Sequence, residues 1–333
     1  MQFNNSFTKI RVFAISPRTI DLSRYWTEIQ NTIQWSEKYN FTGVLIFTGN
    51  DTYVEPWLTA HTVLAETEML SPLVAVNPVY MHPFCTAKMV SSLVHLYKRR
   101  IYLNMVTGAA LNYLEALGDS LSHDERYARM SEHIQIVNLL LTSPNPVSFS
   151  GIHYQVSHLQ LLPRVPTDLA PEFLLAGASK AARNVCSSLG ALGMAMLGPD
   201  LNAVPGCRGI HFGLITRPTR DLARRTALET FPCDEEAQEM LDYSMGNTDS
   251  VWKQNLRREA GNPALSESGY WLGPFRNFKV DCPYVVDEYE KVAELMSRLI
   301  RAGVHTFILD LVPNEEEYAH AAAAFNLVKE LLG

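Results

Sequence analysis

Short apolar segments alternate with longer amphipathic segments along the first half of the chain. Each short segment has four or five residues, most of them β-branched or large and apolar, which is typical of a strand buried on both faces of a sheet. Between these segments, apolar residues recur at helical spacing. The pattern predicts strands at residues 11–15, 44–47, 73–76 and 101–105, and helices at residues 26–39, 57–68 and 83–97.

The second half continues this alternation after one interruption. Residues 147–156 alternate around Gly151 and predict a small hairpin, within an insertion at residues 143–170. Strands are then predicted at residues 173–175, 194–197, 210–216 and 306–310, and helices from 180, after 221, at 285–302 and at 315–332. Residues 231–283 are irregular and predict a lid or insertion, because so long a loop is uncommon inside a compact domain.

Alternating strands and helices predict the α/β class with a parallel sheet. The eight predicted strands favour a TIM (β/α)₈ barrel with insertions over an open sheet. No shift in composition marks a boundary, so we expect one barrel domain over residues 1–333.

Composition narrows the classes of partner. The formal net charge is −7 with no basic stripe, which argues against nucleic acid. No apolar run approaches the roughly 18 residues of a membrane span, and the N-terminus lacks the apolar run of a signal peptide. The five cysteines are scattered without Cys-x-x-Cys spacing, so we expect reduced thiols, no metal site and a cytoplasmic protein.

Polar residues stand at the ends of several predicted strands. Asn104 and Thr107 lie at or just past the end of the strand at 101–105, where ligands bind in barrels. Thr48, Asn77 and His82 follow the second and third strands, and we expect them to line a substrate pocket. Asn104 could equally be a hydrogen-bonded core amide.

A second polar cluster opens the helix that follows. His123 and Tyr127 are four residues apart, so they project from one helix face. They either cap and pack this helix or help to hold a phosphorylated cofactor. No Gly-x-Gly-x-x-Gly, Walker loop, His-Glu-x-x-His or nucleophile elbow is present, which weakens dinucleotide, ATP, zinc and hydrolase hypotheses.

Residues 41–49 (FTGVLIFTG) and 103–108 (LNMVTG) resemble segments of the bacterial luciferase-like flavin monooxygenases. The two-component alkanesulfonate monooxygenases are the nearest group. Four further segments agree in the same order and extend the resemblance over nearly the whole chain: residues 123–127 (HDERY), 150–154 (SGIHY), 177–179 (GAS) and 303–309 (GVHTFIL).

The resemblance implies a flavoprotein on a TIM barrel that oxygenates a small organic substrate. Reduced FMN (FMNH2) would arrive from a separate NAD(P)H-dependent flavin reductase and react with O₂ through a flavin (hydro)peroxide. By analogy, such barrels form homodimers. A deazaflavin-dependent oxidoreductase on the same barrel and a non-catalytic flavin-binding barrel stay open as alternatives.

The resemblance also implies roles for single residues. Asn104 and Thr107 would face the flavin, and Asn104 could hydrogen-bond the flavin or its oxygen adduct. His123, Tyr127, Ser179 and the Ala178 backbone resemble the phosphate-binding set, and a turn leading into a helix suits a phosphate.

The seventh strand departs from the family pattern. His211 and Gly213 stand where alkanesulfonate monooxygenases carry an Arg-x-His pair. His211 is therefore either a general acid or base, or a satisfied core histidine. Most of the cationic side chains that would bind a sulfonate group are missing. We therefore expect a neutral or mostly apolar substrate and not a simple alkanesulfonate.

Overall fold

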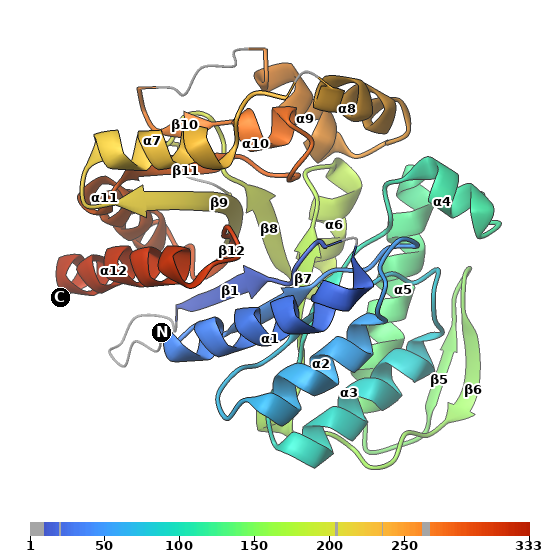
Figure 1. Cartoon of the computed structure of the whole chain (residues 1–333). Helices are drawn as coiled ribbons and strands as arrows, with labels where there is room; N and C mark the ends of the chain where they lie inside the picture. The colour runs from blue at the N-terminus through green and yellow to red at the C-terminus, as the bar shows by residue number, and fades with distance from the viewer. Residues whose placement is uncertain (1–9, 20, 204–205, 235, 262–266) are drawn as a thin grey trace. The chain divides into compact units, whose positions relative to one another are not determined.

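The computed structural model describes residues 10–19, 21–203, 206–234, 236–261 and 267–333 (Figure 1). Its contacts divide the chain into two compact units. The middle unit is Gly43–Gly193, and the terminal unit combines Met1–Thr42 with Met194–Gly333. In both units, parallel strands alternate with helices.

The middle unit is built on four parallel strands, which lie in the order β2-β3-β4-β7. The register places Asn104 of β4 beside Ala75 of β3 and Leu174 of β7. The strands are β2 (Gly43–Ile46), β3 (Leu73–Val76), β4 (Tyr102–Met105) and β7 (Glu172–Ala176). The helices are α2 (Pro56–Glu66), α3 (Pro83–Tyr97), α4 (Leu111–Ala116), α5 (His123–Thr142), α6 (Lys180–Leu189) and the short 3₁₀ helix η1 (Thr167–Leu169).

A hairpin of β5 (Val147–Ser150) and β6 (Gln155–Leu159) extends beside α5 (Figure 1). The Glu132 carboxylate of α5 holds its turn by accepting hydrogen bonds from three successive backbone N–H groups, at 2.8, 2.9 and 3.0 Å, from Ile152, His153 and Tyr154. Such charge-assisted bonds to backbone N–H groups are stronger than neutral ones, so the turn is anchored to the helix.

The terminal unit has the parallel order β11-β9-β12-β1, and β8 also pairs with β9. The first half of β9 lies beside β12 and its second half beside β11. The strands are β1 (Arg11–Ile15), β8 (Leu192–Met196), β9 (Gly209–Arg217), β11 (Tyr284–Glu288) and β12 (Thr306–Asp310), with β10 (Tyr270–Trp271) antiparallel to β11. The helices are α1 (Leu22–Lys38), α7 (Arg220–Thr230), α8 (Glu236–Gly246), α9 (Val251–Glu259), α10 (Gly273–Arg276), α11 (Tyr289–Arg301) and α12 (Glu315–Leu332).

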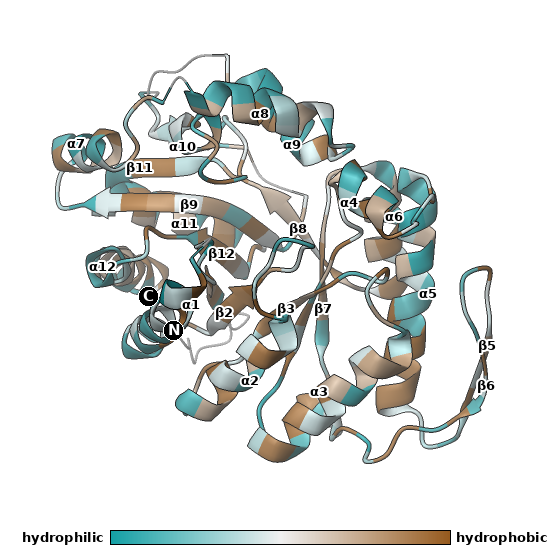
Figure 2. Cartoon of the chain, turned by 45° about the vertical axis from the view of Figure 1, so that its right-hand side comes forward, coloured by the Kyte–Doolittle hydropathy of each residue, from teal (hydrophilic) through white to brown (hydrophobic). Residues whose placement is uncertain are grey.

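Hydrophobic residues concentrate along the strands and on one side of the helices (Figure 2). In the terminal unit, Phe212, Phe307 and Phe325 are fully buried between the sheet and α12. The rings of Phe307 and Phe325 meet edge to face with centroids 6.1 Å apart. This apolar burial is the main stabilising contribution of the unit.

One predicted helix is wrong at its start. Residues 285–302 were expected to be helical, but Tyr284–Glu288 form β11 and the helix begins at Tyr289. Val285 and Val286 pair beside β9, where β-branched side chains pack well against a sheet. The tertiary pairing therefore overrides the amphipathic pattern that continues into α11.

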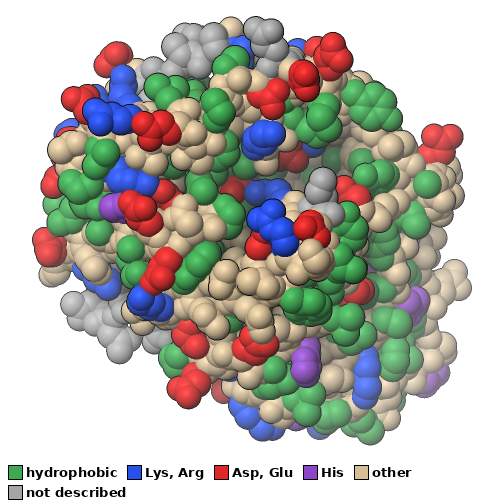
Figure 3. Space-filling view, in the orientation of Figure 1, with side chains coloured by type: hydrophobic (Ala, Val, Ile, Leu, Met, Phe, Trp, Pro, Cys, Tyr) green, Lys and Arg blue, Asp and Glu red, His purple; other side chains and the backbone are tan. Residues whose placement is uncertain are grey.

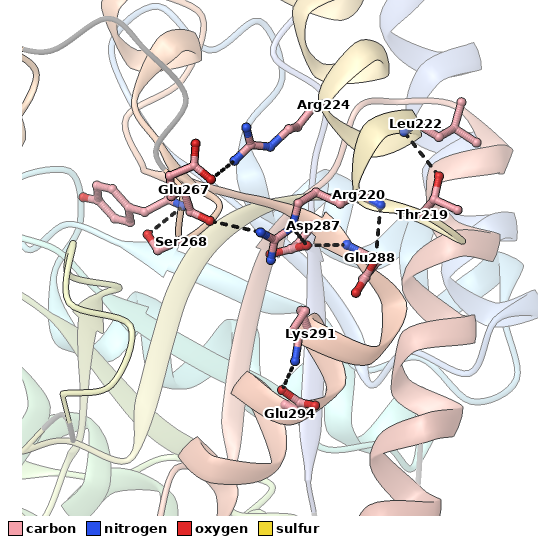
Figure 4. A network of polar contacts seen from close by, with 11 residues as sticks. Thr219, Arg220, Leu222, Arg224, Glu267, Ser268, Asp287, Glu288, Lys291 and Glu294 are labelled. Atoms are coloured by element: carbon pink, nitrogen blue, oxygen red, sulfur yellow. Dashed lines mark hydrogen bonds and ion pairs between the residues drawn. The ribbon is translucent and has the colours of Figure 1, made fainter.

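A polar network fixes the end of β11 against the start of α7 (Figure 4). The Arg220 guanidinium donates to both carboxylate oxygens of Asp287, each at 2.9 Å. The Arg220 backbone N–H donates to the Glu288 carboxylate at 3.3 Å. The network explains why β11 ends in two acidic residues, Asp287 and Glu288.

The irregular region 231–283 contains α8, α9, β10 and α10 within its described residues. It has a small hydrophobic core of its own, formed by Leu241, Leu256, Ala260, Tyr270, Leu272 and Phe275. Residues 235 and 262–266 of this region lie outside the described residues.

The predicted fold class is confirmed. The parallel strands follow in the order β1-β2-β3-β4-β7-β8-β9-β12, which is the order of a TIM (β/α)₈ barrel. In the described part of the chain, no helix combines the length and apolar character needed to cross a membrane. Acidic and basic side chains are interspersed on the face shown in Figure 3.

Candidate functional site

Tyr127 is the centre of a polar cluster in the middle unit. It lies in the second turn of α5 and is 6% exposed. Burial raises the pKa of its phenol, and side-chain hydrogen bonding with Ser179 and Thr107 opposes that shift. Its hydroxyl also approaches the Ala176 carbonyl oxygen at 3.4 Å. The structure thus brings together Tyr127 of α5, Thr107 after β4 and Ser179 at the N-cap of α6, which are far apart in the sequence.

The cluster faces the N-terminus of α6. Ser179 is the N-cap, and its hydroxyl accepts a hydrogen bond from the Ala182 N–H at 3.1 Å. The first N–H groups of a helix and its dipole favour an anion at this end. Gly177, just before the cap, has φ +151°, a conformation essentially confined to glycine.

His123 is the first residue of α5 and stands beside Tyr127. The two ring centroids are 5.0 Å apart. The His123 ring nitrogen Nδ1 also lies 2.7 Å from the Asp124 carboxylate. A capping box formed by Ser122 and Glu125 begins the helix here, so His123 is not needed as the cap.

Asn104 presents a buried oxygen without a partner. It lies on β4 and is 8% exposed, and its Oδ1 atom has no hydrogen-bond partner among the described residues. An unpaired buried polar atom costs about 1–3 kcal/mol. A ligand with an N–H or O–H donor at this strand end would satisfy it.

A cavity of about 750 Å³ opens at the ends of β2 and β3. Thr48 and Asn77 lie on its wall, together with apolar side chains of α2 and α3 that include Trp57 and Leu93. His82 is not among the residues that line this cavity; its Nδ1 accepts the Phe84 N–H at 3.1 Å as the N-cap of α3. The cavity has the size of a small-molecule site.

His211 belongs to a separate cluster within the terminal unit. Its Nε2 atom is buried and has no hydrogen-bond partner in the described chain. Burial lowers the pKa of His211 to about 4, with Asp310 raising it and Arg18 lowering it further. The imidazole is therefore neutral at pH 7, which suits a proton acceptor better than a general acid.

Asp310 gathers the other polar groups of this cluster. Its Oδ2 lies 2.8 Å from the Arg18 guanidinium. The Tyr284 hydroxyl and the Cys282 thiol donate to it over 3.5 and 3.7 Å. Burial raises the pKa values of Cys282 and Tyr284 well above their usual range, so both keep their protons.

The sequence interpretation did not single out Arg18, Cys282, Tyr284 or Asp310. The signal for two of them was present, because Asp310 ends a strand and Arg18 follows the end of another. The rule of strand ends that selected Asn104 would have selected both.

The middle-unit cluster fits FMN. Tyr127, Ser179 and the N–H groups of α6 suit its phosphate, and the unpaired Asn104 oxygen suits a flavin N–H donor. A Cβ at position 177 would stand 2.5 Å from the Tyr127 hydroxyl, so the glycine makes the tight approach possible. The predicted residues Thr107, His123, Tyr127 and Ser179 are brought together, and Ala178 lies next to them in the turn before α6.

Comparisons with known proteins show the family of this chain. A family profile described as luciferase-like monooxygenase matches residues 7–203. The 4-(γ-L-glutamylamino)butanoyl-[BtrI acyl-carrier protein] monooxygenase BtrO of Niallia circulans is 29% identical over 308 residues, which cover 89% of each chain.

Solved structures share the fold at lower identity. EDTA monooxygenase (EmoA) from Chelativorans sp. BNC1 superposes with a TM-score of 0.70 and 15% identity, over 97% of this chain and 95% of that one. The oxygenating constituent of 3,6-diketocamphane monooxygenase from Pseudomonas putida, solved in complex with FMN, gives 0.68 and 14% over 96% of each chain.

Proposed function

The chain belongs to the luciferase-like monooxygenase family and is a flavin-dependent monooxygenase, and we propose that its flavin is reduced FMN. A separate NAD(P)H-dependent reductase supplies that flavin, and O₂ is the co-substrate. The observation that carries the proposal is the meeting of Tyr127, Ser179 and Thr107 at the N-terminus of α6. Reduced riboflavin lacks the phosphate of FMN and therefore has no anionic group to bind at this helix N-terminus.

Different residues of the cluster bind different parts of the flavin. The Tyr127 and Ser179 hydroxyls and the α6 N–H groups hold the phosphate, and His123 packs against Tyr127 at the rim. Asn104 and Thr107, at and after the end of β4, hold the ring side. Hydrogen bonds to a charged phosphate are stronger than neutral ones, so losing one should weaken binding measurably.

Bound flavin supplies the activation of O₂ and the oxygen transfer. The protein orients the ring, excludes water and positions the substrate. Thr48 and Asn77 on the wall of the 750 Å³ cavity offer polar contacts to a substrate in an otherwise largely apolar space. His82 stays a proposed neighbour of that pocket, and the helices in region 231–283 a proposed lid.

The substrate is a small organic molecule other than a simple alkanesulfonate. No Arg-x-His pair stands on β9, where His211 and Gly213 are found. BtrO acts on a carrier-bound 4-(γ-L-glutamylamino)butanoyl group, which supports an acyl substrate with a polar end. His211, neutral at pH 7, serves as the proton acceptor when the substrate needs one.

Anaerobic titration with reduced FMN tests the cofactor assignment. We expect saturable binding that weakens about tenfold or more in Tyr127→Phe and Ser179→Ala, because each removes a hydrogen bond to a charged group. Ser187→Ala, an exposed serine of the same helix, is the matched control. Reduced riboflavin should bind weakly to all four proteins.

Two results contradict the proposal. One is an absence of saturable binding; the other is equal affinity in Ser179→Ala and Ser187→Ala. Oxygen uptake with reductase and NAD(P)H separates a monooxygenase from a deazaflavin-dependent oxidoreductase, which transfers hydride without consuming O₂. Flavin binding without any oxidised product would favour a non-catalytic barrel.

We propose two further properties by analogy with such barrels. The chain forms a homodimer, and it works in the cytoplasm, where its five cysteines stay reduced, as no disulfide joins them here. Light scattering of the purified protein tests the first: a monomeric mass at micromolar concentration would contradict it.

A further inference from the structure

The polar cluster around Asp310 lies where the strands of the terminal unit end. Asp310 is the last residue of β12, and Arg18 follows the end of β1. In barrels this end of the strands carries the ligand-binding groups. The FMN proposal uses residues of the middle unit and leaves this cluster without a role beyond His211.

Asp310 is a buried carboxylate whose contacts from the described donors Tyr284 and Cys282 are long. Its side chain is 5% exposed, and Arg18 supplies one short contact, at 2.8 Å. The donors Tyr284 and Cys282 lie at 3.5 and 3.7 Å, at the long limit for such bonds. A buried carboxylate is stable when several donors satisfy it, so a further donor would be favourable here.

His211 adds an unsatisfied atom to the same place. One of its two ring nitrogens, an Asp310 carboxylate oxygen and the Cys282 sulfur all lie within 4.8 Å of one another. Two acceptors that each lie ~2.9 Å from one tetrahedral ammonium nitrogen are ~4.7 Å apart. One ammonium group can therefore reach both the carboxylate and the neutral imidazole.

Arg18 supplies a positive charge beside the Asp310 carboxylate. Its side chain is 38% exposed, in contrast to the buried groups that it faces. A guanidinium presents five N–H donors in a planar fork that matches a carboxylate. The partly exposed cation thus stands next to a buried anion, at a spacing of 2.8 Å.

We propose that Arg18 and Asp310 recognise an amino-acid head group of the substrate, with the carboxylate on Arg18 and the ammonium on Asp310 and His211, which gives His211 a binding role in place of that of a proton acceptor. This inference rests on the proposed function for its role in catalysis, and it replaces the expectation of a neutral substrate with a zwitterionic end. The expectation of a neutral substrate depended on sequence motifs that do not include Arg18.

A metal ion is the competing occupant, because His, Cys and Asp are all metal ligands. The guanidinium at 2.8 Å from Asp310 argues against it, because that positive charge repels a divalent cation about twice as strongly as it repels a singly charged ammonium at the same distance. The buried thiol also keeps its proton, which metal binding would have to displace. The charges therefore favour a zwitterion.

Ligand-observed NMR with three matched probes tests the proposal on the full chain. L-Norvaline carries both charges, pentanoate lacks the ammonium, and 1-aminobutane lacks the carboxylate. We expect L-norvaline to bind at least about tenfold more tightly than either of the others, because each lost charge-assisted hydrogen bond is worth a factor of that order. The measurement needs no flavin.

Two variants should each weaken the binding of a different pair of probes. Arg18→Gln should weaken L-norvaline and pentanoate and leave 1-aminobutane unchanged or tighter. Asp310→Asn should weaken L-norvaline and 1-aminobutane. Arg24→Gln, which removes an exposed arginine paired with Glu28 on α1, should change none of the three. Circular dichroism and thermal melting establish that each variant is folded.

Three outcomes would overturn the proposal. The first is equal binding of the three probes to the unaltered chain, a result that does not depend on any variant. The second is unchanged L-norvaline binding in a folded Arg18→Gln protein. The third is a Co²⁺–thiolate absorption band that Cys282→Ser abolishes and Cys207→Ser preserves, which would assign the cluster to a metal. Loss of reduced-FMN binding in Ser179→Ala tests the proposed function separately.

Discussion

The Tyr127 hydroxyl lies against the backbone of Gly177. A Cβ at position 177 would be 2.5 Å from that oxygen and 2.8 Å from the Ala182 Cβ. Contacts this short do not occur, so the tyrosine and α6 approach each other only because residue 177 has no side chain. The same approach places Tyr127 beside Ser179.

Gly177→Ala should therefore damage both stability and cofactor binding. We expect the free energy of unfolding to fall by about 2 kcal/mol or more, from backbone strain and overpacking. Reduced FMN should bind more weakly because Tyr127 is displaced. Urea unfolding and anaerobic titration measure the two effects.

Gly190→Ala is the control for this prediction. Gly190 ends the same helix with φ +65°, and no atom lies within 4 Å of its virtual Cβ. It should lose about 1 kcal/mol of stability with no change in FMN affinity. Equal FMN affinities in the two variants would contradict the role of the Gly177 contact.

Asn104→Leu should stabilise the chain while weakening the flavin site. The Asn104 Oδ1 atom is buried without a partner, and an apolar side chain of similar size removes that cost. We expect the free energy of unfolding to rise by about 1 kcal/mol and reduced FMN to bind less tightly. Asn184→Leu, at an exposed position on α6, should change neither quantity. A destabilised Asn104→Leu protein would show that the amide has a structural partner.

His133 should make stability depend on pH. The ring is fully buried, and burial lowers its pKa to about 3. Between pH 6.5 and about 3 the unfolded chain binds a proton that the folded chain does not, so stability is full above pH 6.5 and falls as the pH drops. The loss from this group is up to about 4 kcal/mol near pH 3.

Urea unfolding between pH 4 and 7 measures that dependence. His133→Gln should flatten the fall in unfolding free energy, whereas His61→Gln at an exposed position should not. His211, with its pKa lowered to about 4, contributes in the same direction. An unchanged slope in His133→Gln would contradict the prediction.

Arg217 and Glu317 form a buried ion pair between β9 and α12. Their side chains are 5% and 4% exposed, and Arg217 Nη1 donates to Glu317 Oε2 at 3.0 Å. Either Arg217→Met or Glu317→Gln should cost about 3–5 kcal/mol, since one charge stays buried alone. The double variant should cost much less than the sum.

A double-mutant cycle by urea unfolding gives the coupling of this pair. The exposed pair Lys291–Glu294 on α11 is the comparison, and its coupling should be much smaller because water screens the two charges. Additive losses at Arg217 and Glu317 would mean that the two charges are stabilised independently.

The predicted elements and the structure agree where local pattern decides the conformation. The helix expected at 315–332 is α12, and the strands expected at 73–76 and 306–310 are β3 and β12. They differ at β11, because Val285 and Val286 continue into an amphipathic helix and only their pairing with β9 marks them as a strand. The spacing of apolar residues along the sequence gives no information about which strand will pair with a segment.

Some residues of the candidate sites could likewise be predicted from the sequence, and others could not. Positions at a strand end and a helix start were sufficient to nominate Asn104 and Tyr127, and the resemblance to the family added Ser179. By itself, then, the sequence determined the class of fold and the family, and it nominated the residues of the proposed cofactor cluster. Only the tertiary structure decided that Arg18 faces Asp310, because a contact across nearly three hundred residues depends on how strands pair and not on any local pattern.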